Sequence, residues 1–543
     1  MNRRALDTED LKLLELLIEK GASLDIPDTE GRTPIMIAAI KGHLCVVRYL
    51  MENQASITTV DLREKTILHL AARYDRPEVL ALLLEGREDE VINMNNLPDH
   101  MENTALHVAA RAGSVEATRE LLRPDSYLMD IDQKNWDEQT ACHVAAAYGN
   151  WQVIELLLQR DPNGIYDQDE DDNIPLHLAA RHSHDVTVQM LLDAGSPIRK
   201  RNRQEWTALD CAAATGGKRC CVVLLDNGAE LDSLDRKKLT PLHLAAKHNW
   251  SSTVQLLLDR GANVVLEDLK GYNALELAIK AGNRLCVEVI LGCREWRLAM
   301  KTVHTVKNRR GEDVPDTPMR MLIKRFPDLA EQVFDKCIVQ TDKEVEFNYE
   351  LLDDAYSLEK YEEKGGVTFK YRKPTDADVD FQTYDGNGTV SMENHPLMLM
   401  VNGNSKMLLR HPLCLALLRW KWRSVGRWVF WFQFFHYVFF LISLTGYILT
   451  KLTREGFQEN ISDTTFCPET DVNLRGFQIA VFASTILGAV LECSQLIRMK
   501  SRYFRFSNMV DWVLYVLSVF FVLDLCLPFK TNGCQGMQVR HIF

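Results

Sequence analysis

Thr240-Pro241-Leu242-His243-Leu244-Ala245 is the stretch that decides the fold, because related blocks recur along the N-terminal half of the chain. An earlier copy reads Thr66-Ile67-Leu68-His69-Leu70-Ala71. The copies are separated by 33 to 38 residues, a period that indicates stacked structural repeats. They begin at Thr33, Thr66, Thr104, Thr140, Ile174, Thr207, Thr240 and Asn273.

The block resembles the T-P-L-H-x-A signature of ankyrin repeats. Thr is suited to cap a first helix, and Pro fits its first turn. The resemblance predicts paired helices over residues 1–297, as about eight repeats after a partial first one. Leu11 to Leu17 reads as a second helix without its first, which suggests missing N-terminal repeats; a shortened capping repeat is the alternative.

One histidine recurs in five of the blocks and could be mistaken for a metal ligand. Because it returns once per repeat, it should form a row along the stack rather than converge on one ion. We therefore interpret these histidines as structural hydrogen-bonding residues: His69, His107, His143, His177 and His243.

Charge and cysteine usage narrow the class of protein. A formal net charge of −12 argues against a nucleic-acid partner. The thirteen cysteines form neither CxxC pairs nor a zinc-binding spacing, which favours buried free thiols in a reducing compartment. The charged first twenty residues do not read as a signal peptide, so we expect the N-terminal half to be cytosolic.

A coupling region is expected over residues 298–410. Pro318 to Ile338 reads as helical, whereas 345–349 and 367–371 alternate apolar and polar residues as strands do. These patterns predict helices with a small antiparallel sheet. A basic pre-membrane helix should follow at 411–427.

Three apolar stretches are long enough to cross a bilayer, at 428–449, 477–497 and 509–527. Basic residues precede the first and connect the second to the third, which predicts a cytosolic N-terminus. The loop between the first two should face outward, and its sequon at Asn460 is a candidate glycosylation site. The tail at 528–543 would then be extracellular. The fold class is mostly α: a solenoid, a coupling region and an incomplete transmembrane helix bundle.

This plan resembles the ankyrin-type transient receptor potential (TRPA) cation channels. Local similarity is carried by Thr317-Pro318, His411-Pro412-Leu413-Cys414, Glu492-Cys493-Ser494-Gln495 and Ser507-Asn508-Met509-Val510-Asp511-Trp512. The resemblance implies a tetrameric, calcium-permeable channel of the plasma membrane that senses chemicals or temperature. Members of the family have six spans, with the pore between the fifth and the sixth, whereas this sequence ends just beyond its third apolar stretch. We therefore expect this chain to be a fragment or a truncated isoform without a pore.

Four oxygen-bearing side chains are candidates for a regulatory Ca²⁺ site. Glu492 and Gln495 stand at i and i+3 on the second span, and Asn508 and Asp511 at i and i+3 on the third. Such oxygen donors suit a hard cation, and ionisable groups inside a span usually have a function. The TRPA resemblance places its calcium site at the same four positions. The alternative is an interhelical hydrogen-bond cluster without metal.

Electrophile sensing is a further implication of the resemblance. Cys337 corresponds to one reactive cysteine of the family and Lys421 to its reactive lysine, but Thr317 and Asp354 occupy the other principal cysteine positions. A reactive thiol needs exposure and a lowered pKa. The alternative is that Cys337 is an inert structural residue.

Two other classes of protein also combine ankyrin repeats with membrane spans. The chain could be a membrane-anchored ankyrin adaptor, or a non-conducting regulatory isoform, with cytosolic protein ligands on its repeats. An ankyrin-linked palmitoyl transferase would need an Asp-His-His-Cys block, which the sequence lacks. We therefore expect no enzyme and no organic cofactor, with lipid and further subunits as partners.

Overall fold

The computed structural model describes residues 14–86, 97–123, 130–307, 313–340, 345–352, 358–363, 366–371, 395–458, 471–499 and 512–519. The chain divides into two compact units, Met1–Cys414 and Leu415–Phe543. The predicted boundary between 297 and 298 therefore falls inside the first unit. The expected fold class is confirmed: paired helices fill the N-terminal half, strands are few, and long apolar helices follow.

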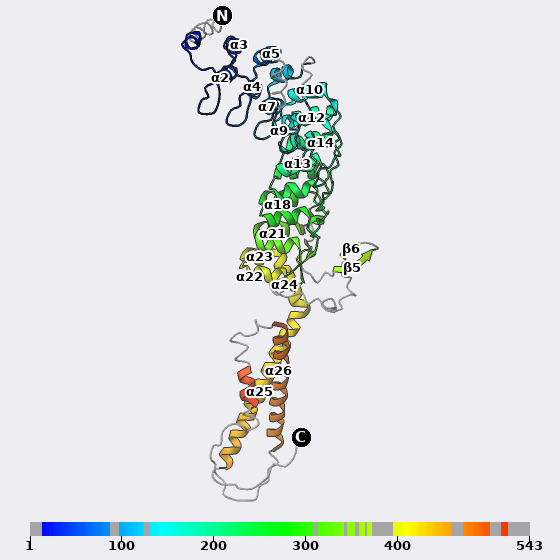
Figure 1. The fold of residues 1–543 in the computed structure, drawn as a ribbon. Helices are drawn as coiled ribbons and strands as arrows, with labels where there is room; N and C mark the ends of the chain where they lie inside the picture. Colours follow the sequence, from blue (N-terminus) through cyan, green and yellow to red (C-terminus); the bar gives the residue numbers. More distant parts are fainter. Residues whose placement is uncertain are drawn as a thin grey trace. The chain divides into compact units, whose positions relative to one another are not determined.

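Each recurring block begins a pair of antiparallel helices, so the predicted array is present (Figure 1). A short helix at 14–19 precedes the first pair. The first helices of the pairs are α2 Pro34–Lys41, α4 Ile67–Arg73, α7 Ala105–Ala112, α9 Ala141–Tyr148, α11 Pro175–Arg181, α13 Ala208–Thr215, α15 Pro241–Lys247 and α17 Ala274–Ala281. The second helices are α3 Leu44–Glu52, α5 Pro77–Gly86, α8 Val115–Leu121, α10 Trp151–Arg160, α12 Asp185–Asp193, α14 Lys218–Asp226, α16 Ser251–Asp259 and α18 Arg284–Gly292.

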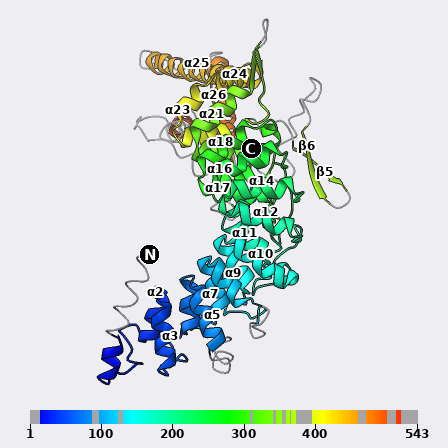
Figure 2. The ribbon, with the colours of Figure 1, turned by 90° about the horizontal axis from the view of Figure 1, so that it is seen from above.

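Small residues let the first helices stack closely. Their paired alanines are fully buried, as Ala71–Ala72 and Ala245–Ala246 illustrate. In Figure 1 the first helices α9 and α13 lie on one side of the stack and the second helices α10, α12 and α14 on the other. Figure 2 shows the same separation of the first helices α9 and α11 from α10, α12 and α14. A short 3₁₀ turn, Pro162–Ile165, extends one of the connecting loops.

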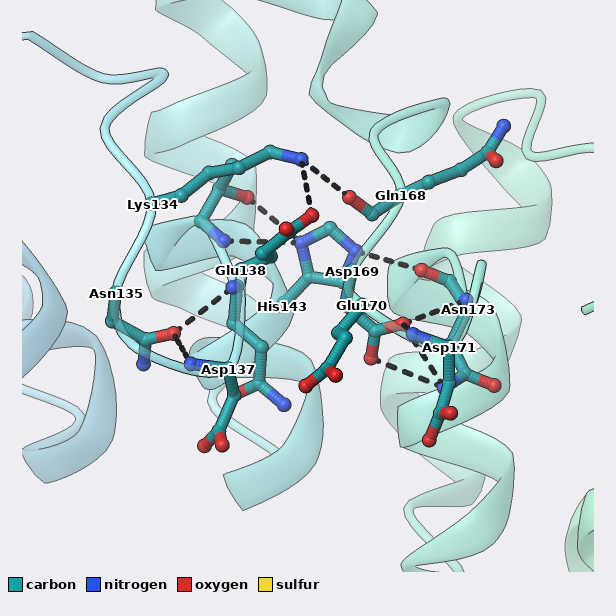
Figure 3. A network of polar contacts seen from close by, with 12 residues as sticks. Lys134, Asn135, Asp137, Glu138, His143, Gln168, Asp169, Glu170, Asp171 and Asn173 are labelled. Atoms are coloured by element: carbon teal, nitrogen blue, oxygen red, sulfur yellow. Dashed lines mark hydrogen bonds and ion pairs between the residues drawn. The ribbon is translucent and has the colours of Figure 1, made fainter. Parts of the chain in front are cut away.

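The recurring histidines form a hydrogen-bonded ladder. In His143 the Nδ1 atom accepts from the Thr140 backbone N–H at 3.3 Å, which requires the proton to be on Nε2. Nε2 then donates to the carbonyl of Asn173 in the next repeat at 3.0 Å (Figure 3). His69, His107 and His177 make the same two contacts. The structural interpretation of these four histidines is therefore confirmed.

A second hydrogen-bonded ladder lies at the C-terminal ends of the first helices, whereas the histidine ladder lies at their N-terminal ends. The side chain just before or at the start of a second helix donates to the last carbonyls of the preceding repeat's first helix, which the helix itself leaves unbonded. The donors differ chemically from repeat to repeat: Arg76 to Ile40, Asn150 to Ala110, His184 to Ala147, Trp250 to Ala214 and Asn283 to Ala246, at 2.7–3.1 Å.

The coupling region contains more helix and more separate strand pairs than expected. The helix predicted over Pro318 to Ile338 is two helices, α20 Pro318–Arg325 and α21 Pro327–Lys336. Pro327 explains the break, because proline lacks an N–H and disfavours helical backbone at Phe326. Two further helices, α22 Pro396–Asn402 and α23 Lys406–Arg410, follow, and α20 contacts α22. The short helix α19 Trp296–Ala299 connects this region to the array.

The single small sheet expected here is instead three separate antiparallel pairs among the described residues. They are β1 His304–Lys307 with β2 Asp313–Asp316, β3 Ile338–Gln340 with β4 Val345–Phe347, and β5 Leu358–Glu363 with β6 Gly366–Tyr371. The alternating patterns thus located strands at 345–347 and 366–371, but each strand pairs only with its neighbour in sequence.

The second unit is built on two long apolar helices. Helix α24 Pro412–Lys421 runs through a π-helical turn, Trp422–Gly426, into α25 Arg427–Gln458, and α26 Asp471–Met499 contacts α25. Arg427–Leu452 and Gly476–Cys493 are long and apolar enough to cross a membrane. Of the third predicted span, the structure describes a helix at 512–519.

Candidate functional site

The coupling helices are bound to the end of the array through the second ladder. Arg325, the last residue of α20, donates from Nη1 to the Lys280 carbonyl at 2.6 Å. Lys336, the last residue of α21, donates from Nζ to the Leu291 carbonyl at 2.6 Å. The first bond repeats the contact made at the five junctions of the second ladder, so α20 and α21 stack on α17 and α18 as a further helix pair.

A buried contact between a carboxyl group and an imidazole lies between the last repeat and the first strand. Glu276 occupies the position that His fills in the neighbouring repeat, and its Oε2 accepts from the Asn273 N–H at 3.0 Å. Its Oε1 lies 3.0 Å from Nδ1 of His304 on β1, although the two atoms are not aligned as a hydrogen bond. Tyr272 lies edge-on to the imidazole. The sequence showed that Glu replaces His in this repeat, but gave no sign of its partner.

Cys337 follows α21 directly and is buried. Its sulfur-bearing side chain is 4% exposed, and burial raises the pKa of the thiol to about 11, although Arg297 acts in the opposite direction. Its backbone N–H donates to the Phe334 carbonyl, and its carbonyl accepts from Asn348. These surroundings favour the structural alternative over the reactive one.

The start of α24 is fixed to α21 by His411. Nε2 of His411 lies 3.0 Å from Oδ1 of Asp335, and the imidazole packs against the ring of Phe334. His411 is almost fully buried and Asp335 largely exposed. Sequence similarity pointed to His411, but only its contact with Asp335 shows that α21 is attached to the start of α24.

Lys421 ends α24 in the second compact unit, whereas Cys337 lies in the first. Its side chain is half-buried. The electrophile-sensing role predicted for Lys421 and Cys337 therefore stays a prediction. Asn460, the candidate glycosylation site, lies outside the described residues.

The predicted calcium ligands are described only in part. Helix α26 continues without a break through Glu492 and Gln495, so the two stand at i and i+3 on one helix face, as a shared site requires. The Glu492 side chain is half-buried. Asn508 and Asp511 lie outside the described residues, and the four-residue set stays a prediction.

The apolar helices α25 and α26 contact each other through aromatic and small residues. Phe440, Tyr447 and Val481 form a buried cluster. A Cβ atom added to Gly446 would lie 2.6 Å from the ring of Phe477, so glycine is needed for this close approach. His436 Nε2 lies 3.0 Å from the Ser484 carbonyl, which gives this polar side chain a partner between the helices.

Alkylation tests the assignment of Cys337. A pKa of about 11 leaves roughly one thiol in several thousand ionised at pH 7.4, and only the thiolate attacks iodoacetamide. We expect Cys337 in the folded protein to be labelled at least about tenfold more slowly than the exposed Cys45, as followed by peptide mass spectrometry. Equal labelling rates would instead support the reactive alternative, and urea should abolish the difference.

Comparison with known proteins identifies the repeats, and it finds relatives that match almost the whole chain. The family model described as ankyrin repeats (3 copies) matches residues 4–96, 90–166, 161–235 and 216–296. The chain is 28% identical over 564 residues to a transient receptor potential cation channel subfamily A member 1 homolog of Caenorhabditis elegans, covering 94% of this chain and 46% of that protein. It is 27% identical to the subfamily A member 1 channel of Homo sapiens, covering 95% and 45%.

A third relative matches a much smaller share of the chain. Inversin of Canis lupus familiaris is 33% identical over 214 residues, which is 38% of this chain and 19% of that protein. The chain thus spans about half the length of the two TRPA relatives that it matches. Those relatives are named as channels and not as enzymes.

Proposed function

Because the chain belongs to the ankyrin-repeat family and resembles TRPA proteins over almost its whole length, we propose that it is the cytosolic sensor and first transmembrane part of a TRPA-like cation-channel subunit. One observation carries this proposal. The likeness to the two TRPA proteins continues through 94–95% of the chain, whereas the likeness to inversin covers 38%. A protein that used ankyrin repeats alone would share only the array.

The contacts of the coupling helices support a mechanical role for the array. Arg325 joins α20 to the last repeat, and the Asp335–His411 contact joins α21 to the start of α24. A solenoid is elastic along its axis, and a displacement at its end would reach α24 through these two contacts. Calcium permeability, tetramer formation, plasma-membrane localisation with a cytosolic N-terminus, and chemical or thermal sensing belong to the same proposal.

A chimeric channel tests the proposal. Residues 1–543 would replace the matching half of the human relative, and whole-cell cation currents would be recorded while temperature and electrophiles are varied. We expect surface expression and stimulus-dependent current. The control carries only the second half of the human protein.

If the chain is an adaptor instead, the same cells should show no current. A chimera that assembles and reaches the cell surface, yet carries no current under any stimulus, would contradict the channel proposal. Capture of cytosolic proteins by such a silent chimera would then favour an ankyrin adaptor or a non-conducting regulatory isoform.

We further propose that Glu492, Gln495, Asn508 and Asp511 bind a regulatory Ca²⁺ from the cytosolic side. Two carboxylates and two amide oxygens suit this ion, and the charge of the site is the main determinant of its affinity. Glu492→Gln should therefore raise the Ca²⁺ concentration for half-maximal modulation by on the order of tenfold in excised inside-out patches.

The matched control for this experiment is Glu455→Gln, an acid that the charge pattern places on the outer side. It should leave the Ca²⁺ dependence unchanged. If Glu492→Gln behaves in the same way, the four side chains form a hydrogen-bond cluster rather than a metal site.

A further inference from the structure

The first helices of the array expose cations and bury their acids. Only two acids lie on these helices, Asp210 and Glu276, and both are fully buried. Five of the same helices carry a cation at one register, seven residues after the N-cap. We call this row the basic ridge: Arg73, Arg111, Arg181, Lys247 and Lys280.

The cations of the basic ridge are not neutralised by neighbouring acids. Arg181 is half-buried and the other four are exposed, and among the described residues none of the five forms an ion pair. The nearby acid Asp75 lies in the turn after Arg73, and its Oδ1 already accepts from the Ala117 N–H at 2.8 Å.

Aromatic side chains lie beside the ridge. Arg111 lies over the ring of Tyr148, and Arg73 over the ring of Tyr74, each at 5.6 Å from the ring centroid. Tyr148 is 54% and Tyr74 42% exposed. The surface therefore offers both charge and flat apolar area to a bound chain.

The second helices carry charges of both signs. Each of them has at least one acid, and the second helices α10, α12 and α14 lie on the other side of the stack from α9 and α13 (Figure 1). The helix dipole favours a cation in the last turn of any helix. It does not explain why the last turns of the second helices include acids, among them Glu52, Asp193, Asp226 and Asp259. The separation of charge is thus a property of one face.

We propose that the basic ridge docks an extended acidic segment of a protein partner. Stacked helices lie about 8–10 Å apart, and an extended chain advances about 3.3 Å per residue. One repeat therefore matches about three residues of the bound segment. An acid at every third position would meet a ridge cation in five repeats, and Ala147 or Ala214 in the two other repeats between Arg73 and Lys280. The proposal does not depend on whether the chain belongs to a channel.

A protein segment fits this surface better than a broad anionic surface does. The ridge is a single row of five cations, and it belongs to a chain with a net charge of −12. A lipid bilayer or a nucleic-acid duplex presents a broad negative surface, which the negative charge of the whole molecule repels. A single extended chain needs only the row itself.

Binding of a designed peptide tests the proposal on the full 543-residue chain in detergent. The probe is a fluorescent 21-residue peptide with Glu at every third position and Ser or Gly elsewhere, followed by anisotropy at 50 and 300 mM NaCl. We expect saturable binding that weakens with salt. Replacing all five ridge cations by Gln should weaken it about tenfold or more, because five exposed pairs are lost.

The matched control removes the same charge from the second helices, by Gln at Arg48, Arg119, Arg160, Lys218 and Arg219. It should change the affinity less than about twofold. The double variant Lys247→Gln/Lys280→Gln should give an intermediate loss, and it keeps the test valid if the fivefold variant does not retain its circular dichroism spectrum. Equal losses in ridge and control variants, no binding by the wild type, or preferential binding of vesicles rich in phosphatidylserine would each overturn the proposal.

Discussion

Gly216→Ala should lower the free energy of unfolding of the first compact unit, expressed as residues 1–414, by about 3 kcal/mol. Gly216 ends α13 with a φ of +81°, a conformation that L-residues rarely adopt. A Cβ atom there would lie 2.3 Å from the indole of Trp250. The ring would have to move, and its hydrogen bond from Nε1 to the Ala214 carbonyl at 2.9 Å would be lost.

Gly228→Ala is the matched control for this change. Gly228 also has a positive φ, +86°, but a Cβ atom there would meet nothing within 4 Å. Only the backbone cost of about 1 kcal/mol should remain. Urea unfolding followed by circular dichroism would measure both variants. Equal destabilisation would mean that Trp250 adjusts freely and that its rung of the second ladder contributes little.

His143→Ala should destabilise the same unit by about 3 kcal/mol at pH 7.4. The side chain of His143 is fully buried, and its removal leaves the Thr140 N–H and the Asn173 carbonyl without their partner. The control is His100→Ala, since His100 is exposed and bonds only the Arg63 carbonyl through its ring. Both would be measured by urea unfolding, and a loss below that of the control would refute the ladder as a source of stability.

The effect of His143→Ala should depend on pH. Burial lowers the pKa of His143 to about 4, below the ordinary value of 6.5 that it has when unfolded. The unfolded chain therefore binds the additional proton between these two values, so the stability due to His143 is complete above pH 6.5 and is lost as the pH falls towards 4. At pH 4.5 the difference between wild type and variant should be smaller by about 2 kcal/mol. A difference that does not change with pH would contradict the burial of a neutral imidazole.

The repeat period and the histidine ladder were predictable from the sequence because the same residue types recur at the same position of each block. The second ladder was not, since Arg76, Asn150, His184 and Trp250 share a position but not a residue type. Comparing the repeats of a sequence with one another detects only positions where the same residue type recurs. A free carbonyl at the end of a helix accepts a hydrogen bond from any side-chain donor that reaches it, so the residue type there can vary.

In the histidine ladder, one later repeat has an acid in place of the recurring histidine. The sequence shows this replacement but does not explain it. Asp210 replaces the recurring His, and burial raises the pKa of its carboxyl to about 6. Its Oδ2 accepts from Thr207 and from the Ser233 hydroxyl at 3.0 Å, so a serine supplies the contact that a carbonyl makes elsewhere. The identity of such partners depends on loops whose positions follow only from the folded stack.

The candidate calcium site and the state of Cys337 were predictable from the sequence only in part. The helical spacing of Glu492 and Gln495 follows from the sequence period alone, and α26 has it. Convergence with Asn508 and Asp511 depends on how two helices meet, which no local pattern specifies. The burial of Cys337 likewise results from the packing of α21, so a motif could indicate a cysteine but not its reactivity.

The bonds from Arg325 and Lys336 to the last repeat have a practical consequence for where the protein can be cut. A fragment that stops at residue 297 would lack α20 and α21, exposing the apolar residues of α17 and α18 that these helices cover. Such an end face is an aggregation hazard, because solenoids need a polar terminal unit to stay soluble. Recombinant fragments of the array should therefore extend at least through residue 340, and limited proteolysis should leave the first repeats and α21 on one resistant piece.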